Sequence, residues 1–450
     1  MPPRGKRAAI PAMSRALRTD LVDAAVLEAF GLVHEQGWLS DRALDRVLRR
    51  ERRLYANERR AVAESVYGIL RSEGQLAWLL GAAEAGAASR DLSTLYALFL
   101  ARSGGAPAGA AGRRLGVSPR LLEGALLRAD ERIARIADPV TRLSVESSLP
   151  FWIAERLVAE FGFGEGRALS LALNVRAPLT VRANLLKTER EALRERLASE
   201  GVTSRPTRFS PWGLVLDGHE NAFALSSFRE GLFEIQDEGS QLIALAVGAR
   251  AGQNVVDACA GAGGKALALA AEMHGKGSLH ALDPDPGRLE EARRRARRAS
   301  VHNLRTRLIP AGPEADKALA DLGGSCDRVL VDAPCSGLGS LRRNPDLRLR
   351  LAPEDAARYA ALQKELLLRY AKLLKPGGRL VYATCAIGRA ENEEVAGFAG
   401  REVPGLSPCR LEAALGERLA AALGVKEAAA TLLPHRHGTD GFFFAAFVRG

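Results

Sequence analysis

The sequence predicts an α/β fold for the C-terminal part of the chain, with a parallel sheet covered by helices on both faces. Short apolar runs alternate with amphipathic helical segments from residue 251 to the end, and this order requires crossover connections between parallel strands. A glycine-rich turn at 259–264 joins the first run to its helix. Two later runs lead into loops that carry Cys335 and Cys385. Ligands of such sheets bind at the carboxyl ends of the strands, so both cysteines are candidate site residues.

The individual elements of this region follow from the same pattern. The expected helices are KALALAAEM, PGRLEEARRRARRAS and PEDAARYAALQKELLLRYAKLL. The expected strands lie in NVVDACAG, SLHALD, LRTRLIPAG, DRVLVDAP, GRLVYATC and DGFFFAAFV. The arginines at 288–300 form the densest basic run, and we expect them to cover a solvated helix face rather than a specific site.

The first 250 residues differ in pattern from this region. Residues 14–145 show helical periodicity, with Ser40, Asn57 and Ser118 as expected N-caps and a loop at 104–112. Residues 146–250 mix both types of element, with helices in LPFWIAERLVAEFG and TEREALRERLASEG and strands in PLTVRANLL, TSRPTRF, GLVLDG and GLFEIQ. We expect a small α+β subdomain there, with Phe151 and Trp152 in its core.

Composition limits the class of protein. Of 450 residues, 47% are hydrophobic and 26% charged, which is typical of a globular chain. The net charge of +11 favours polyanions such as nucleic acid or anionic lipid. No apolar run approaches the roughly 20 residues that span a bilayer, and the N-terminus lacks the apolar segment of a secretion signal. Five cysteines without paired spacing predict reduced thiols in a cytosolic protein.

The glycine-rich turn suggests a nucleotide-type cofactor. Its G-x-G-G pattern is not the G-x-G-x-x-G of dinucleotide-binding proteins. Asp283 ends the next strand, 26 residues after Asp257, where an acidic side chain can accept hydrogen bonds from ribose hydroxyls. Nicotinamide dinucleotides and S-adenosylmethionine both fit. The alternative, a helix-entry turn that binds nothing, is disfavoured because Asp283 and the two cysteines accompany it.

Several segments together resemble one family. DACAGAGGK, ALDPDPGRL, VDAPCSGLGSLRRNPD, YATCAIGRAENEEV and HGTDGFFFAAFVR resemble successive motifs of the Sun/Fmu group of RNA cytosine carbon-5 methyltransferases, the RsmB type in bacteria. FREGLFEIQDEGSQL resembles the pre-catalytic signature of that group, and the helical N-terminal region resembles its NusB-like RNA-binding domain. The resemblance spans roughly residues 18–449. It implies a class I S-adenosylmethionine-dependent methyltransferase with a Rossmann-like sheet and a final antiparallel strand.

This resemblance implies three domains: an all-helical NusB-like RNA-binding domain at 14–145, a pre-catalytic RNA-binding subdomain at 146–250 and the catalytic domain at 251–450. The implied partner is RNA, with 16S rRNA as the first choice and tRNA or another RNA as the alternative. A catalytically weakened RNA-binding or ribosome-assembly factor is a further alternative. We expect a monomer, no membrane partner and no metal, since His435 and His437 have no third ligand near them in the sequence.

The resemblance also assigns the chemistry. Carbon 5 of cytosine is a poor nucleophile until a thiolate adds to carbon 6 and converts the ring to an enamine. By resemblance, Cys385 is the attacking thiol and Cys335 assists proton removal and release, although the residues alone do not order the two. Asp332 would bind the N3 and amino edge of the base, and Lys265 would favour the thiolate. The structural alternative for each cysteine is a small buried apolar residue.

Two groups of binding residues complete the expected site. Arg342 and Arg343 are expected to contact RNA phosphates beside an everted base. The expected cofactor-binding residues are Cys259, Ala260, Gly261, Ala262, Gly263, Gly264, Lys265, Asp283 and Asp332.

The sequence departs from the family pattern at two places. The family usually has Cys-Ala-Ala-Pro-Gly-Gly-Lys-Thr at the first loop, whereas this chain has Gly261, Ala262 and Ala266 at three of these positions. The family also has an aspartate on the adenine side of the cofactor, near 312–313 here, where Glu314 and Asp316 are the nearest acids. Both departures favour the assembly-factor alternative.

Overall fold

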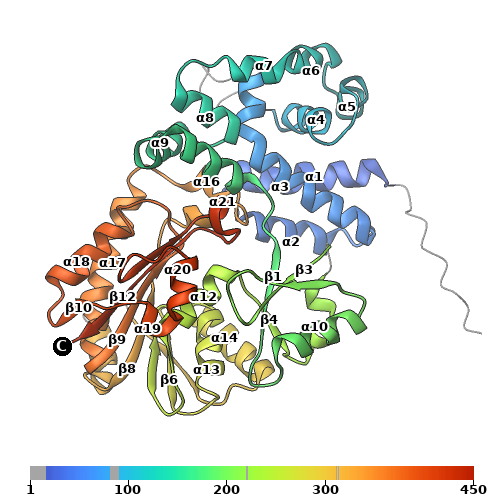
Figure 1. Cartoon of the computed structure of the whole chain (residues 1–450). Helices are drawn as coiled ribbons and strands as arrows, with labels where there is room; N and C mark the ends of the chain where they lie inside the picture. The colour runs from blue at the N-terminus through green and yellow to red at the C-terminus, as the bar shows by residue number, and fades with distance from the viewer. Residues whose placement is uncertain (1–16, 82–90, 219–220, 311, 313) are drawn as a thin grey trace, which may run out of the picture. The chain divides into compact units, whose positions relative to one another are not determined.

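The computed structural model describes residues 17–81, 91–218, 221–310, 312 and 314–450 (Figure 1). The chain divides into two compact units, Met1–Ala137 with Val145–Ser148 and Asp138–Ser144 with Leu149–Gly450. Residues 14–16 of the expected helical domain and Pro313 lie outside the described residues. Among the described residues, no helix combines the length and apolar character needed to cross a bilayer.

The first unit is helical. Its core includes Phe30, Ile69, Leu70 and Tyr96, and the Tyr96 hydroxyl donates to Asp23 at 2.8 Å. The helices are α1 (Thr19–His34), α2 (Ser40–Arg50), α3 (Ala56–Leu79), α4 (Leu92–Arg102), α5 (Ala108–Leu115), α6 (Pro119–Leu126) and α7 (Ala129–Ala134), with α8 (Pro139–Ser147) across the division of the units.

Three sequence-based details of these helices are wrong. The N-cap of α3 is Tyr55 rather than Asn57, because the Glu58 carboxylate reaches back to accept the Tyr55 N–H at 2.8 Å. Helix α5 occupies part of the expected loop. Its alanines are strong helix formers, and Gly112 allows a close approach, since a Cβ there would lie 2.6 Å from the Val117 carbonyl oxygen. Ser40 is the first residue of α2 rather than its cap.

The second unit begins with a small antiparallel sheet. Its strands are β1 (Leu179–Ala183), β2 (Ser204–Pro206), β3 (Gly213–Leu216) and β4 (Phe233–Ile235), in the order β2-β3-β1-β4. Helices α9 (Phe151–Asn174), which is kinked at Gly162, and α10 (Arg190–Ser199) accompany it, followed by η1 (Ala222–Ala224) and α11 (Ser226–Arg229). Phe151 is 52% exposed, so its expected core position is wrong. As the first residue of α9, it lies outside the repeat of buried positions that begins at Ile153.

The larger sheet confirms the predicted α/β class. Its strand order is β10-β12-β9-β8-β5-β6-β7, with β11 paired to β12. The pairs among β5 to β9 are parallel, and β12 pairs antiparallel with β9. The strands are β5 (Asn254–Asp257), β6 (Ser278–Asp283), β7 (Leu304–Leu308), β8 (Cys326–Asp332), β9 (Leu374–Thr384), β10 (Leu406–Pro408), β11 (Ala429–Leu432) and β12 (Phe442–Arg449).

Helices cover both faces of this sheet (Figure 1). Successive strand residues point to opposite faces, so Val255 packs in one core with α12 (Glu238–Val247) and α13 (Gly264–Glu272), while Val256 packs in the other with α17 (Asp355–Tyr370) and α18 (Glu393–Glu402). The remaining helices are α14 (Pro286–Ala299), α15 (Glu314–Ala318), η2 (Ala320–Leu322), η3 (Leu338–Ser340), α16 (Leu347–Arg350), η4 (Ala371–Leu373), α19 (Glu412–Leu415), α20 (Glu417–Ala422) and α21 (Pro434–His437).

Candidate active site

The two cysteines lie in contact at one edge of the larger sheet. Strands β8 and β9 are parallel neighbours, so their carboxyl ends meet, and each chain segment places a cysteine just beyond its strand. The Sγ atoms of Cys335 and Cys385 are 3.3 Å apart. The Cys385 N–H also donates to the Cys335 Sγ at 3.3 Å. The separate loops therefore form one dithiol site.

An ion pair lies beside this dithiol site. The Lys265 Nζ, from the first turn of α13, is 2.6 Å from an Asp332 carboxylate oxygen at the end of β8. Burial disfavours the ammonium form, but the charge and hydrogen bond of Asp332 outweigh it and raise the pKa of Lys265; Cys385 is close enough to add to this effect. Lys265 therefore remains protonated at neutral pH and places a positive charge near the dithiol site.

The environment distinguishes the two thiols. The hydrogen bond with Cys385, followed by burial, raises the pKa of Cys335 well above its usual range. Both effects favour the neutral thiol form of Cys335 over its thiolate. Burial likewise raises the pKa of Cys259 far above its usual range, which keeps that thiol neutral.

The glycine-rich turn is held by its neighbours. The Gly261 N–H donates to an Asp283 carboxylate oxygen at 2.9 Å, and the Ala262 carbonyl accepts from Arg295 at 2.9 Å. Gly263 has φ +82°, and a Cβ there would lie 2.9 Å from the Ala292 Cβ. A glycine is therefore required where the turn enters α13.

Asp257 is an unusual buried carboxylate at the end of β5. Its side-chain oxygens have no hydrogen-bond partner within normal limits among the described residues, although the Cys259 amide lies nearby. Burial, and then the charge of Asp332, raise the pKa of Asp257 to about 7, against the opposing charge of Lys265. An unpaired buried carboxylate is costly, and burial therefore favours the neutral form of Asp257.

Replacing Asp257 with asparagine should stabilise the ligand-free protein by a few kcal/mol at pH 8 and have little effect near pH 4. In the unfolded chain this aspartate has the ordinary pKa of 3.8 and is ionised above that pH. In the folded protein its pKa is raised to about 7, so it stays protonated up to about pH 7. The wild type therefore loses stability as the pH rises between these values. Urea unfolding at both pH values measures the effect, with the half-exposed Asp217→Asn as control. Equal effects of Asp257→Asn at both pH values would contradict it.

A cavity of about 340 Å³ opens beside these groups. It is large enough for a small ligand. Its walls come from the β4–α12 connection, the glycine-rich turn and the strand ends, and comprise Ile235, Gln236, Asp237, Ser240, Ala260, Gly264, Lys265, Arg295, Asp332, Arg343 and Asp440. The turn and the Lys265–Asp332 pair thus face a common space.

Arg342 and Arg343 are engaged by carboxylates in the structure. Arg342 pairs with Asp440, and Arg343 lies 2.5 Å from Asp440 and 2.8 Å from Asp237. The Arg342 side chain is only 7% exposed. Burial, and then the charge of Asp237, raise the pKa of Asp440 against the opposing charges of both arginines. Phosphate contact by these arginines stays a prediction, and for Arg342 it would require breaking these ion pairs.

Arg342→Leu should lower the free energy of unfolding by about 3 kcal/mol, because the buried carboxylates of Asp237 and Asp440 would then share Arg343 alone. Urea denaturation followed by tryptophan fluorescence measures this change. The control is Arg358→Leu, whose partner Asp355 lies one helical turn away and whose own side chain is 68% exposed. A variant with unchanged stability but weakened RNA binding would instead support the phosphate contact.

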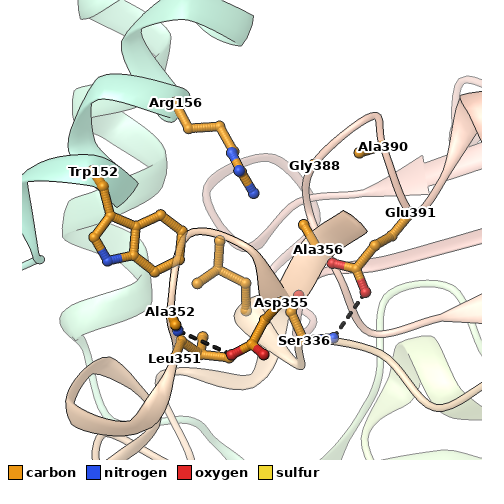
Figure 2. A pocket seen from close by; sticks show the side chains of 11 residues that line it. Trp152, Arg156, Ser336, Leu351, Ala352, Asp355, Ala356, Gly388, Ala390 and Glu391 are labelled. Atoms are coloured by element: carbon orange, nitrogen blue, oxygen red, sulfur yellow. Dashed lines mark hydrogen bonds between the residues drawn. The ribbon is translucent and has the colours of Figure 1, made fainter. Parts of the chain in front are cut away.

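A second, narrower cavity lies behind the Cys335 loop (Figure 2). The Ser336 N–H donates to Glu391 at 2.8 Å, and burial raises the pKa of Glu391. The Gln363 amide donates to the Pro334 carbonyl at 2.9 Å and to Glu391 at 3.2 Å. Trp152, expected in the core, lines this cavity with Arg156. Gln363 and Glu391 support the Cys335 loop but were not among the predicted site residues, although Glu391 lies in the segment YATCAIGRAENEEV.

The two acids nearest to the expected adenine side of the cofactor each pair with a cation in the structure. Glu314 pairs with Lys317 at 2.8 Å and Asp316 with Arg369 at 3.1 Å. Both carboxylates are more than half exposed. Neither belongs to the wall of the 340 Å³ cavity.

The sheet order, with its antiparallel β12, and the site at the strand ends define a class I methyltransferase fold. Residues 244–448 match the family model "16S rRNA methyltransferase RsmB/F", and residues 149–222 match "Methyltr_RsmF/B-like, ferredoxin-like domain". The ribosomal RNA small subunit methyltransferase B of Pseudomonas putida is 32% identical over 82% of this chain and 83% of its own length. The ribosomal RNA small subunit methyltransferase B of Xylella fastidiosa is 34% identical over 68% of this chain and 70% of its own length. The chain belongs to the RsmB/F methyltransferase family.

Solved structures agree with this assignment. The crystal structure of PH0851 aligns with a TM-score of 0.77 and 25% identity over 96% of this chain and 99% of that chain. The structure of a methyltransferase homologue from Pyrococcus horikoshii aligns with a TM-score of 0.58 and 26% identity, over 70% of this chain and 98% of that chain.

Proposed function

We propose that this protein transfers a methyl group from S-adenosylmethionine to carbon 5 of a cytosine in small-subunit rRNA, through a covalent adduct with Cys385. The observation that carries the proposal is the contact between two thiols, 3.3 Å apart, beside the Lys265–Asp332 pair. Two thiols in contact suit a reaction in which one thiol forms the bond to the base and the second assists its breakage. The names of the relatives support rRNA as the substrate.

The residues present fit the cofactor. Asp283, which already orients the Gly261 amide, is placed to accept hydrogen bonds from ribose hydroxyls, and the turn from Cys259 to Lys265 brings backbone groups to the helix entry of α13. The bound cofactor would supply an electrophilic methyl group.

Three side chains of the protein act on the base in different ways. The Cys385 thiolate forms a bond to carbon 6, and the Asp332 carboxylate accepts a hydrogen bond from the amino group of the base. The Lys265 ammonium, 2.6 Å from Asp332, offsets the negative charge that builds up toward N3. Preorganised charges of this kind act without rearrangement during the reaction.

The contact between the thiols also suggests when Cys335 acts. Its pKa is raised mainly by the hydrogen bond with Cys385. Once Cys385 is bonded to carbon 6, it no longer accepts this bond as a thiolate, so the pKa of Cys335 falls. With the methyl group on carbon 5, Cys335 can lose its proton to solvent and then take up the proton of carbon 5. The electron pair of that C–H bond re-forms the ring double bond, and the carbon–sulfur bond breaks to release the Cys385 thiolate.

The helical region is proposed to bind rRNA. Helix α2 exposes Arg42, Arg46, Arg49 and Arg50, and arginines on one helix suit phosphate contacts with a steep salt dependence. We propose that residues 14–145 form the helical RNA-binding domain, residues 146–250 the pre-catalytic RNA-binding subdomain and residues 251–450 the catalytic domain.

In vitro methylation tests the function. Purified small-subunit rRNA is incubated with the protein and S-adenosylmethionine labelled in the methyl group, then digested to nucleosides and analysed by mass spectrometry. The expected product is 5-methylcytidine, with tRNA as the comparison substrate. A label on another atom or base, or no transfer by protein that binds the cofactor, would reject the proposal.

A further inference from the structure

Helix α14 is not the uniformly solvated basic face that the sequence suggests. Arg293, Arg294 and Arg297 pair with glutamates of their own helix. Arg295 and Arg298 instead reach Glu234 on β4, and their side chains are only 18% and 21% exposed. The helix therefore presents two arginines to the small antiparallel sheet.

Arg295 joins three separate parts of the second unit. Its Nε and Nη2 lie 3.2 and 2.9 Å from one carboxylate oxygen of Glu234. Its Nη1 donates to the Ala262 carbonyl at 2.9 Å. Glu234 is 3% exposed and stands opposite Arg182 in the β1–β4 pair. Because a guanidinium is planar and its donors have fixed directions, the position of Glu234 constrains the position of Ala262.

The turn needs such a constraint. Gly261 has φ +53°, and a Cβ there would meet nothing within 4 Å, so its surroundings do not confine it. Ala262 has no ring to restrict its backbone, unlike the proline usual at this position in the family. The two consecutive residues are instead held through polar groups, the Gly261 amide by Asp283 and the Ala262 carbonyl by Arg295.

We infer that Arg295 is a positioning residue that holds the glycine-rich turn in its cofactor-binding conformation and couples this turn to β4. The inference rests on the proposed function, since S-adenosylmethionine is the ligand of the turn. Arg295 replaces, by a side-chain contact, the stiffness that a proline at 262 would give. The cofactor affinity of this protein thus depends on Glu234 in the small antiparallel sheet, because Glu234 holds the arginine that holds the glycine-rich turn.

Calorimetry with S-adenosylhomocysteine on the full chain tests the inference. Arg295→Gln should raise the Kd about tenfold, the order expected for losing a hydrogen bond to a charged group, and should speed hydrogen exchange of the 259–265 segment. Arg294→Gln, on the same helix but 73% exposed, should change neither. Arg298→Gln also breaks a bond to Glu234 but does not touch the turn, so it should lower the melting temperature and leave the Kd within about twofold.

A rescue separates positioning from direct contact with the ligand. Ala262 has no positive φ, and its amide donates no hydrogen bond to another backbone group of the described part of the chain, so neither feature opposes Ala262→Pro. In the Arg295→Gln background it should restore the Kd and the slow exchange. A loss of affinity with unchanged exchange and no rescue would overturn positioning and assign Arg295 to the ligand. Unchanged affinity in Arg295→Gln would also overturn it.

Two further outcomes remain interpretable. If Arg295→Gln does not fold, Arg295→Lys keeps a charge for Glu234 but cannot hold both partners, and the same loss of affinity is expected. If the wild type binds no S-adenosylhomocysteine, the proposed function fails, and the role of Arg295 fails with it.

Discussion

Cys385→Ala should abolish methyl transfer to rRNA, with a loss of at least about 10⁴-fold in kcat, because removing a catalytic nucleophile eliminates the covalent route. Cys335→Ala should behave differently. The Cys385 thiol remains able to attack the base, but the group that completes release is gone. This variant should accumulate a protein–RNA adduct that survives denaturing gel electrophoresis.

The control for both variants is Cys409→Ala, which removes a half-buried thiol that is outside the dithiol site. It should retain full activity and form no stable adduct. The double variant Cys335→Ala, Cys385→Ala should also form none. If adducts accumulate in Cys385→Ala instead, the roles of the two thiols are reversed. Full activity of Cys385→Ala would reject covalent catalysis.

Asp332→Ala should lower kcat by about 10²–10³-fold, the usual effect of removing a preorganised electrostatic group from an active site. The loss has two parts. The base loses its hydrogen-bond acceptor, and Lys265 loses the charge that raises its pKa. Burial then lowers the pKa of Lys265, so the residual activity should fall at a lower pH than in the wild type. Single-turnover rates between pH 6 and pH 10 measure both effects.

Asp327→Asn is the matched control, since Asp327 lies near the opposite end of β8 and pairs with its own lysine, Lys375. It should keep the wild-type kcat and pH profile. If Asp332→Ala changed KM for RNA with unchanged kcat, Asp332 would serve in binding alone, and the proposed role in charge stabilisation would be wrong.

The fold was largely predictable because its signals are local. Strand–helix alternation after residue 251 requires parallel strands, and this requirement predicts that Cys335 and Cys385 reach the same sheet edge. The errors are also local in origin. The start of α3 depends on the reach of Glu58 to Tyr55, and α5 depends on a close contact that Gly112 permits. Neither is visible as a periodicity.

The arginines show where prediction from the sequence failed. Charge and helical spacing suggested that 288–300 is solvated, but Arg295 and Arg298 find Glu234 more than sixty positions earlier in the chain. Arg342 and Arg343 likewise meet Asp440 nearly a hundred positions later. Two residues so far apart in the sequence leave no periodicity or motif that would predict their contact.

By itself, the sequence determined the class of sheet and the kinds of groups at its edge, because the alternation of strands and helices along the chain and the position of each loop follow from neighbouring residues. Only the tertiary structure decided that contact with Cys385 and burial raise the pKa of Cys335. It also decided which arginines pair with carboxylates and that the buried Asp257 carboxylate has no hydrogen-bond partner among the described residues. These properties depend on burial and on distances of about 3 Å between groups far apart in the chain, and such distances exist only once the chain has folded.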